Sequence, residues 1–339
     1  MYLPRASLTI AIFICPSLIY GQSARDVLAG EFRWTAGPPL VAAQDRDGDQ
    51  YYSIKDPTVV RFGGQWHVFC SIRGKNRSHQ IEYLSFPSWD QTGRARRQTL
   101  KITDGYFCAP QVFYFRPHKK WYLIYQVVDK SRQPALQPAF STTANIADVS
   151  SWTAPRLLIE DAAKGVKSWI DFWVICDDTK AHLFFTTLNG QMWRAETTKE
   201  AFPGGWSQAQ IVLKDDIYEA SHTYRLKDLN KFLTVVEAQG QGGRRYYKAY
   251  LADRLDGEWT PLAATSTRGF ALPANVRFSG EPWSESFSHG ELLRDGHDET
   301  LTVDPANLRF LFQGVADKDR DGKIYGQIPW KLGLLKAAR

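Results

Sequence analysis

The chain repeats one pattern of apolar and polar positions five times. Each copy has an apolar segment with an unusual residue at its start, then a turn, a very apolar aromatic segment, and a more polar segment. Short apolar runs bounded by turn residues such as Gly63-Gly64 and Asp177-Asp178 predict β-strands. The second apolar segment is the clearest in every copy. These second segments are Trp66–Cys70, Trp121–Tyr125, His182–Phe185, Phe232–Val236 and Leu308–Phe312.

A Trp after the polar segment predicts a fourth strand in each copy. The markers are Trp89, Trp152, Trp206, Trp259 and finally Trp330. Four-stranded units of this kind predict an all-β fold, a single-domain five-bladed β-propeller over residues 23–339. Trp34-Thr35-Ala36 resembles the marker segments but has no copy of its own, so we expect it to complete the last blade as its outer strand. The alternative is a β-sandwich with coincidental spacing.

The first 22 residues have the pattern of a secretory signal peptide. Arg5 precedes the apolar run Leu8–Tyr20, and small residues follow at Gly21 to Ala24. We therefore expect a secreted, extracellular protein. No later stretch is apolar enough to span a membrane.

Composition narrows the partner classes. The 339 residues carry a net charge of +6, and no basic cluster sits beside an aromatic platform. This predicts a solvated surface that binds neither nucleic acid nor membrane. Cys15 lies in the predicted signal peptide, and the three remaining cysteines have no CxxC spacing. They are predicted to be buried thiols with at most one disulfide: Cys70, Cys108 and Cys176.

The residues at the starts of the first strands are candidates for chemistry, because a propeller brings these starts together around its central channel. They are Asp56, Ala109, Asp171, Glu219 and His289. Clustered carboxylates repel, so at least one pKa must rise. A glycosidase needs this arrangement, with one protonated acid for the leaving oxygen and one ionised base for water. Each carboxylate alone could instead cap a strand end, and His289 could be a core histidine.

Two acidic segments suggest calcium loops only weakly. Asp317–Gly322 matches the first half of an EF-hand loop, but Ile328 occupies the twelfth position, where a Glu is needed. The segment 45–49 has its Gly misplaced. Both are predicted to be polar surface loops.

Several motifs together resemble glycoside hydrolase family 62, the secreted α-L-arabinofuranosidases acting on arabinoxylan. The resemblance runs from Phe32 to Trp330. Its pieces are Lys55-Asp56-Pro57, Ile170-Asp171, Tyr218-Glu219-Ala220, Val236-Glu237-Ala238, Gly243-Arg244-Arg245-Tyr246-Tyr247, Ser288-His289-Gly290-Glu291, Thr302-Val303-Asp304-Pro305, Phe312-Gln313-Gly314 and Ile328-Pro329-Trp330.

The resemblance implies a five-bladed propeller and an inverting mechanism without a cofactor for the chemistry. It implies that Asp56 is the general base, Glu219 the general acid, and Asp171 the carboxylate that tunes the acid and holds the sugar. Further positions match arabinose-pocket residues and a histidine near a structural calcium in the central channel. These are Lys55, Arg245 and Tyr325 for the pocket and His289 for the calcium.

The sequence departs from the family pattern at two places. Ala306 stands where many relatives carry a bridged Cys, and Phe172-Trp173 replaces a polar pair after Asp171, which could alter the pocket rim. The expected partner is arabinoxylan or its oligosaccharides, and the protein is expected to be a monomer. Alternatives are a family 43-type endo-arabinanase or β-xylosidase, a non-catalytic carbohydrate-binding propeller, and a retaining fructosidase.

Overall fold

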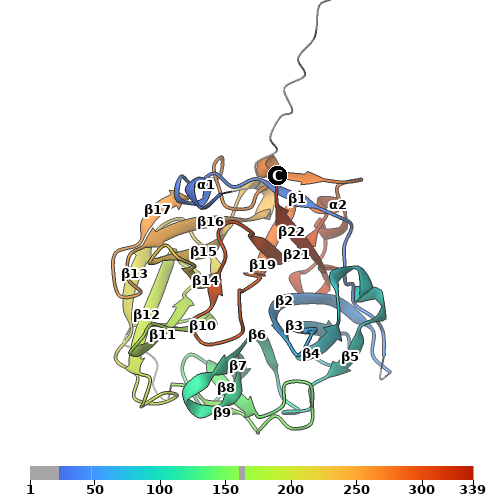
Figure 1. Ribbon diagram of the computed structural model, residues 1–339. Coiled ribbons are helices and arrows are strands. Elements are labelled where there is room, and N and C mark those ends of the chain that lie inside the picture. Colours follow the sequence, from blue (N-terminus) through green and yellow to red (C-terminus); the bar gives the residue numbers. More distant parts are fainter. Residues whose placement is uncertain (1–22, 47, 160–164, 339) are drawn as a thin grey trace, which may run out of the picture.

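Five β-sheets stand around a common axis in the computed structural model, which describes residues 23–46, 48–159 and 165–338 (Figure 1). The sheets follow one another along the chain as blades I to V, and the first strand of each blade borders the axis, joined in blade IV by one short strand from later in the chain. This confirms the predicted propeller. The predicted signal peptide, residues 1–22, lies outside the described residues.

Blades I, II and III are four-stranded and antiparallel, in sequence order from the axis outward. Blade I contains β2 (Tyr51–Phe62), β3 (Gln65–Gly74), β4 (His79–Phe86) and β5 (Arg96–Thr99). Blade II contains β6 (Phe107–Phe115), β7 (Lys120–Val128), β8 (Leu136–Thr143) and β9 (Arg156–Leu157). Blade III contains β10 (Ile170–Cys176), β11 (Lys180–Thr186), β12 (Gln191–Thr198) and β13 (Gln210–Lys214). Each predicted second segment is the second strand of its blade.

Blades IV and V gain strands from distant parts of the chain. Blade IV contains β14 (Glu219–Leu226), β15 (Lys231–Gln239), β16 (Arg245–Ala252), β17 (Thr260–Ala263) and, pairing parallel with β14, β20 (Thr302–Val303). Blade V contains β19 (Ser286–Leu292), β21 (Arg309–Val315), β22 (Lys331–Ala337), β1 (Trp34–Ala36) and β18 (Val276–Phe278).

The N-terminal strand β1 closes the ring. It pairs antiparallel with β22 and parallel with β18, so residues near both ends of the chain share blade V. The predicted closure is confirmed, but β18 and not β1 is the outermost strand. Trp330 was predicted to mark a fourth strand, yet it precedes the third strand β22, and Trp34 itself occupies the fourth. Because β1 supplies the fourth strand of blade V, the last copy of the repeat contributes only three strands to that order.

The remaining regular elements are short. They are α1 (Ala24–Leu28), α2 (Asp317–Arg320), η1 (Trp89–Arg94), η2 (Arg116–His118), η3 (Gln241–Gly243), η4 (Pro273–Asn275) and η5 (Tyr325–Gln327). Among the described residues, we find no helix with the length and apolar character needed to cross a membrane. Asp317 of α2 forms ion pairs with two arginines, Arg244 and Arg320.

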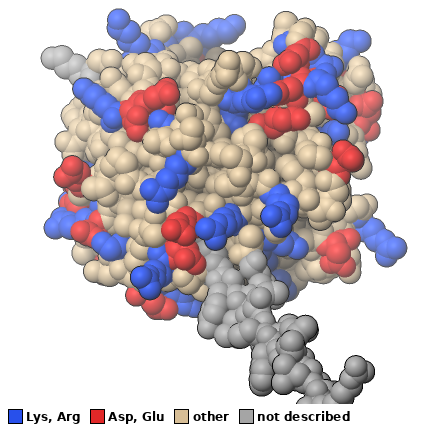
Figure 2. Space-filling view, turned by 90° about the horizontal axis from the view of Figure 1, so that it is seen from above, with Lys and Arg blue, Asp and Glu red and all other residues tan. Residues whose placement is uncertain are grey.

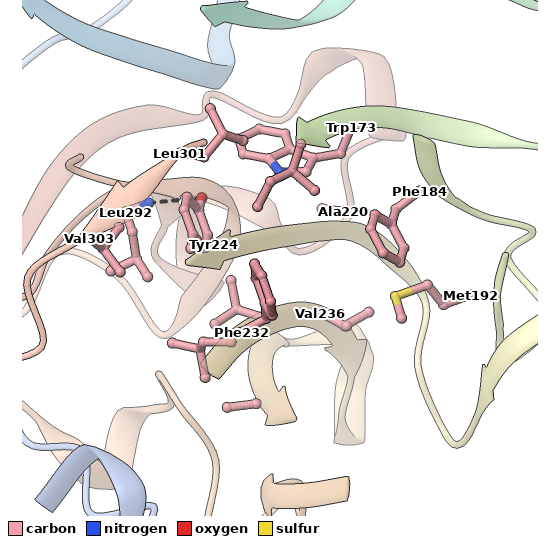
Figure 3. Close-up of a cluster of buried hydrophobic side chains, with 14 of the residues drawn as sticks. Trp173, Phe184, Met192, Ala220, Tyr224, Phe232, Val236, Leu292, Leu301 and Val303 are labelled. Atoms are coloured by element: carbon pink, nitrogen blue, oxygen red, sulfur yellow. Dashed lines mark hydrogen bonds between the residues drawn. The ribbon is translucent and has the colours of Figure 1, made fainter. Parts of the chain in front are cut away.

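The apolar core fills the spaces between neighbouring blades. Figure 3 shows Trp173, Phe184 and Met192 of blade III facing Ala220, Tyr224 and Val236 of blade IV. The Tyr224 hydroxyl also accepts a hydrogen bond from the Leu292 backbone N–H of blade V at 3.0 Å. Each sheet is therefore covered on both faces, and the strands read as continuous apolar runs because of this burial.

The three described cysteines are buried, unbridged thiols, as predicted. The outer surface is mixed in charge. Figure 2 shows Lys and Arg side chains interspersed with Asp and Glu over the visible side of the ring. Such mixing is typical of a solvated surface.

Every innermost strand carries one extra residue at the same height. The pairing with the second strand slips between Lys55 and Thr58 in blade I, and equivalent slips occur in the other four blades. A bulge of this kind bends the strand and re-aims its side chains. Four bulge residues adopt left-handed backbone with φ between 48° and 57°: Asp56, Ala109, Asp171 and Ala220. The fifth bulge residue is His289.

A buried side chain on the second strand lies opposite the residue that precedes each bulge. We call these five residues the bulge partners: Ser71, Gln126, Thr186, Glu237 and Gln313. Four of them accept the backbone N–H of the next blade's bulge residue. These bonds are Ala109 to Ser71 Oγ at 2.8 Å, Asp171 to Gln126 Oε1 at 3.3 Å, His289 to Glu237 Oε2 at 2.7 Å and Asp56 to Gln313 Oε1 at 2.7 Å.

The bulge partners thus fix the angle between successive blades at the axis. Ala220 differs, because its N–H donates to Asp171 Oδ2 at 2.9 Å. A chain of side chain to backbone bonds therefore runs around the channel and holds the strained backbone in place.

We predict that Trp34→Ala destabilises the protein by about 3–5 kcal/mol, since a fully buried aromatic side chain is removed from the closing strand. Trp34 is 1% exposed, and its indole N–H donates to the Phe270 carbonyl at 2.6 Å. Chemical denaturation measures the loss. The control is Thr35→Ala on the same strand, whose exposed side chain should contribute less than about 1 kcal/mol. Equal losses in both variants would contradict this role for Trp34.

Candidate active site

The three predicted carboxylates lie together at one end of the axis, although they are far apart in sequence. Asp56 comes from blade I, Asp171 from blade III and Glu219 from blade IV, and their side chains act on one another electrostatically. They are 5%, 4% and 8% exposed, so they are largely removed from water while keeping some solvent contact. Ionised groups in such a place are costly unless they are paired or have a chemical task.

The sequence suggested that the three carboxylates occupy the same position in the repeat, but the structure places them at two different positions. Asp56 and Asp171 are bulge residues, with φ of 48° and 57°. Glu219 is the residue before the bulge, and Ala220 takes the left-handed position. The bulge turns Asp56 and Asp171 toward the axis, whereas Glu219 projects one residue earlier beside them. Asp tolerates left-handed backbone better than most side chains, which fits its use at two of these positions.

His289 bridges the two aspartates. Its Nδ1 lies 3.5 Å from Asp56 Oδ1 and 3.8 Å from Asp171 Oδ2. Its own backbone N–H is held by Glu237, which fixes the ring at the centre of the cluster.

The prediction of a calcium ion beside His289 is not supported. Ca²⁺ takes about six to eight oxygen ligands. Within the described residues, no group of three or more His, Cys, Asp or Glu side chains is arranged to hold a metal ion. His289 offers a ring nitrogen that already faces two carboxylates, so we interpret it as a bridging residue and not as a metal ligand.

The three predicted pocket residues are all at this end of the axis. Lys55 Nζ lies 3.9 Å from Asp56 Oδ2 and 4.9 Å from the ring centre of Tyr325. Arg245 stacks over Tyr218 at 4.1 Å, and its Nη1 lies 3.4 Å from Glu219 Oε1. Tyr325 is 48% exposed and belongs to η5, so it borders the cluster on the solvent side.

The electrostatic environment separates the carboxylates. Burial alone would raise the pKa of Asp56, but the charges of Lys55 and His289 outweigh it and hold that pKa below its usual value. Burial raises the pKa of Asp171 to about 6, with the charge of Asp56 adding to the rise and His289 opposing it.

Glu219 is displaced in the opposite direction from Asp56. Burial raises its pKa well above the usual value, and the neighbouring charges of Glu237 and Asp171 raise it further, while Arg245 opposes them. One carboxylate of the cluster is therefore ionised under conditions in which another is protonated. That combination supplies a general base and a general acid in one site.

Several residues at this site had no role predicted from the sequence. Glu237, fully buried on β15, accepts hydrogen bonds from Arg245, Ser288 and the His289 backbone. Gln126 donates to Cys108 Sγ at 3.3 Å beside the bulge of blade II. The signal for Glu237 was present, because a lone Glu in an otherwise apolar second strand lies opposite Glu219 once the hairpin is paired.

Phe172 and Trp173 do not lie at a pocket rim. They are 2% and 1% exposed and pack within the core between blades. Trp173 stacks on His222 at 4.1 Å and donates its indole N–H to the Thr223 carbonyl at 2.9 Å. This departure from the family pattern therefore changes the support behind the site.

Comparison with known proteins shows which family this chain resembles. A family model described as glycosyl hydrolase family 62 matches residues 33–336. α-L-Arabinofuranosidase C of Cellvibrio japonicus (strain Ueda107) is 38% identical over 317 residues, covering 91% of this chain. The alignment covers 48% of that relative, so the chain spans about half its length.

Two solved structures are similar over nearly their whole length. The catalytic domain of the Coprinopsis cinerea GH62 α-L-arabinofuranosidase is 36% identical with a TM-score of 0.85, covering 91% of this chain and 98% of that one. A GH62 hydrolase in complex with xylotriose is 37% identical with a TM-score of 0.83, covering 90% and 97%.

Proposed function

Because the chain belongs to glycosyl hydrolase family 62, we propose that it is an inverting α-L-arabinofuranosidase that removes arabinofuranosyl side chains from arabinoxylan. The observation that carries this proposal is the opposite displacement of two pKa values in one cluster, downward for Asp56 and upward for Glu219. Both inverting and retaining glycosidases use such a pair, and the anomer of the fresh product distinguishes them.

In the proposed reaction, Glu219 donates its proton to the oxygen that joins arabinose to the xylose unit, and the bond from C1 to this oxygen breaks. Asp56 takes a proton from a water molecule, whose oxygen bonds to C1 from the opposite face of the sugar. The products are β-arabinofuranose and a xylan hydroxyl. Asp56 is then protonated and Glu219 ionised, and proton exchange with solvent restores both.

Asp171 and the cations support this chemistry. Asp171 accepts the Ala220 N–H beside Glu219, and its negative charge is one cause of the raised Glu219 pKa. Lys55 and Arg245 present donors to the furanose hydroxyls, while the half-exposed Tyr325 contacts the sugar. The complex of a 37% identical GH62 hydrolase with xylotriose supports xylan as the polymer that carries the arabinose.

We place the protein outside the cell, on the basis of the apolar N-terminal segment and the polysaccharide substrate. It acts as a monomer on arabinoxylan or its oligosaccharides, without a cofactor for the chemistry.

The anomer of the released sugar tests the proposed inversion. Incubation with wheat arabinoxylan in deuterated buffer, followed by proton NMR, should show free β-arabinofuranose before mutarotation and an intact xylan backbone. An initial α-anomer would contradict inversion. Release of xylose or of arabino-oligosaccharides would favour a family 43-type activity instead.

Substitution of Glu219 tests its role as the general acid. Glu219→Gln should lower kcat on arabinoxylan about 10²–10⁴-fold, because the amide cannot donate the proton. The loss should be smaller on a dinitrophenyl arabinofuranoside, whose leaving group needs little protonation. The remaining activity should not fall on the alkaline side, since Gln does not ionise.

Glu258→Gln is the matched control for this variant, because Glu258 is exposed before β17 and outside the cluster. It should retain wild-type rates on both substrates. Normal hydrolysis of arabinoxylan by Glu219→Gln would rule out Glu219 as the acid.

A further inference from the structure

Glu237 is the one charged residue among the five bulge partners. The other four are Ser71, Gln126, Thr186 and Gln313. Gln126 and Gln313 accept the N–H of the next blade's bulge residue as Glu237 does. The donor–acceptor distance is 3.3 Å for Gln126 and 2.7 Å for both Gln313 and Glu237. A neutral amide is therefore sufficient for the structural task at this position. A buried charge is costly, so its presence needs a further reason.

The contacts of Glu237 show what its charge touches. Its Oε2 accepts bonds from Ser288 Oγ at 2.9 Å and the His289 N–H at 2.7 Å. Its Oε1 accepts Arg245 Nη1 at 2.9 Å. All three of these partners are donors, which match the acceptor oxygens of a carboxylate.

Arg245 lies between two carboxylates and is closer to one of them. Its Nη1 is 2.9 Å from Glu237 Oε1 but 3.4 Å from Glu219 Oε1. Its guanidinium also rests on the Tyr218 ring at 4.1 Å, which fixes its plane. The stronger of its two ion pairs is thus made away from Glu219.

We propose that Glu237 is a positioning residue that draws the charge of Arg245 away from Glu219 and so keeps Glu219 protonated for proton donation. This inference rests on the proposed function, in which Glu219 is the acid. Glu237 also links the acid to the base. Hydrogen bonds run from Glu219 through Arg245, Glu237, Ser288 and Gln313 to the backbone N–H of Asp56.

Other charged and titratable groups also face Glu219. They are Lys55 and Asp56 on β2, Asp171 on β10, Tyr325 on η5 and, through the two aspartates, His289 on β19. The burial of Glu219 and the charges of Glu237 and Asp171 all act in the same direction on its pKa, against Arg245. Without the charge of Glu237, the lowering effect of Arg245 on the pKa of Glu219 is opposed by fewer groups, so this pKa should fall.

Glu237→Gln tests this directly. The amide oxygen can still accept the His289 N–H, as Gln126 and Gln313 do in their blades, so the fold should persist. The amide NH₂ cannot accept from Arg245, which is then left to Glu219. We expect the alkaline fall of kcat/KM to move to lower pH by at least about one unit. Above that pH, activity on arabinoxylan should drop about tenfold or more, because one pKa unit is a factor of ten.

The substrate dependence separates this role from a merely structural one. The loss should be smaller on a dinitrophenyl arabinofuranoside, which needs little proton donation. Glu82→Gln is the matched control, since Glu82 is equally buried and paired with Arg97 at 2.7 Å, on β4 away from the axis. It should lower thermal stability without moving the pH profile. A uniform loss in Glu237→Gln at all pH values and on both substrates would overturn the proposal.

A carboxyl ¹³C NMR titration of Glu219 gives a readout that does not depend on activity. The Glu219 resonance, assigned from Glu219→Gln, should titrate at lower pH in Glu237→Gln and at higher pH in Arg245→Gln. If wild type fails to hydrolyse arabinoxylan, the proposed function fails, yet these titrations still decide the role of Glu237. If Glu237→Gln does not fold, Arg245→Gln decides, and an unchanged or lower titration there overturns the proposal.

Discussion

One extra residue in every innermost strand is the constraint on which the rest of this structure depends. Without the bulge, Asp56 and Asp171 would follow the ordinary alternation of a strand and point into the contacts between blades. With it, they turn toward the axis at the cost of left-handed backbone, about 1–3 kcal/mol for each such residue. The neighbouring blade offsets that strain, because its bulge partner accepts a hydrogen bond from the buried N–H of the bulge residue.

The same bulges explain how acidic side chains are stabilised in a largely buried site. Each blade supplies two positions near the axis, the bulge residue and the residue before it. Blade I places a cation and a carboxylate in succession, Lys55 and Asp56. Blade V places Ser288 and His289, which hold the carboxylates of other blades. Opposite charges thus come from adjacent positions, and together with burial these neighbouring charges determine the direction in which each pKa moves.

The sequence predicted the blades well because their second strands are buried on both faces and read as continuous aromatic runs. It also predicted Asp56, Asp171 and Glu219 as one cluster, since the starts of the first strands in a propeller meet at the axis. It did not predict β18 or β20. These strands have three and two residues and exist only through parallel pairing with β1 and β14, which no local pattern records.

The structural role of the bulge partners could not be predicted from the sequence for a related cause, although the lone Glu237 in its apolar strand was a visible signal. The bond between Asp56 and Gln313 joins positions 257 residues apart, and its meaning depends on ring closure. When the five positions are compared by their strand register, however, the neutral residues show that an uncharged acceptor is enough to hold the N–H of the next blade's bulge residue. A charged residue at such a position does more than accept this hydrogen bond, and its charge is explained by the charged groups next to it. For Glu237 those neighbours are Arg245 and, through it, Glu219.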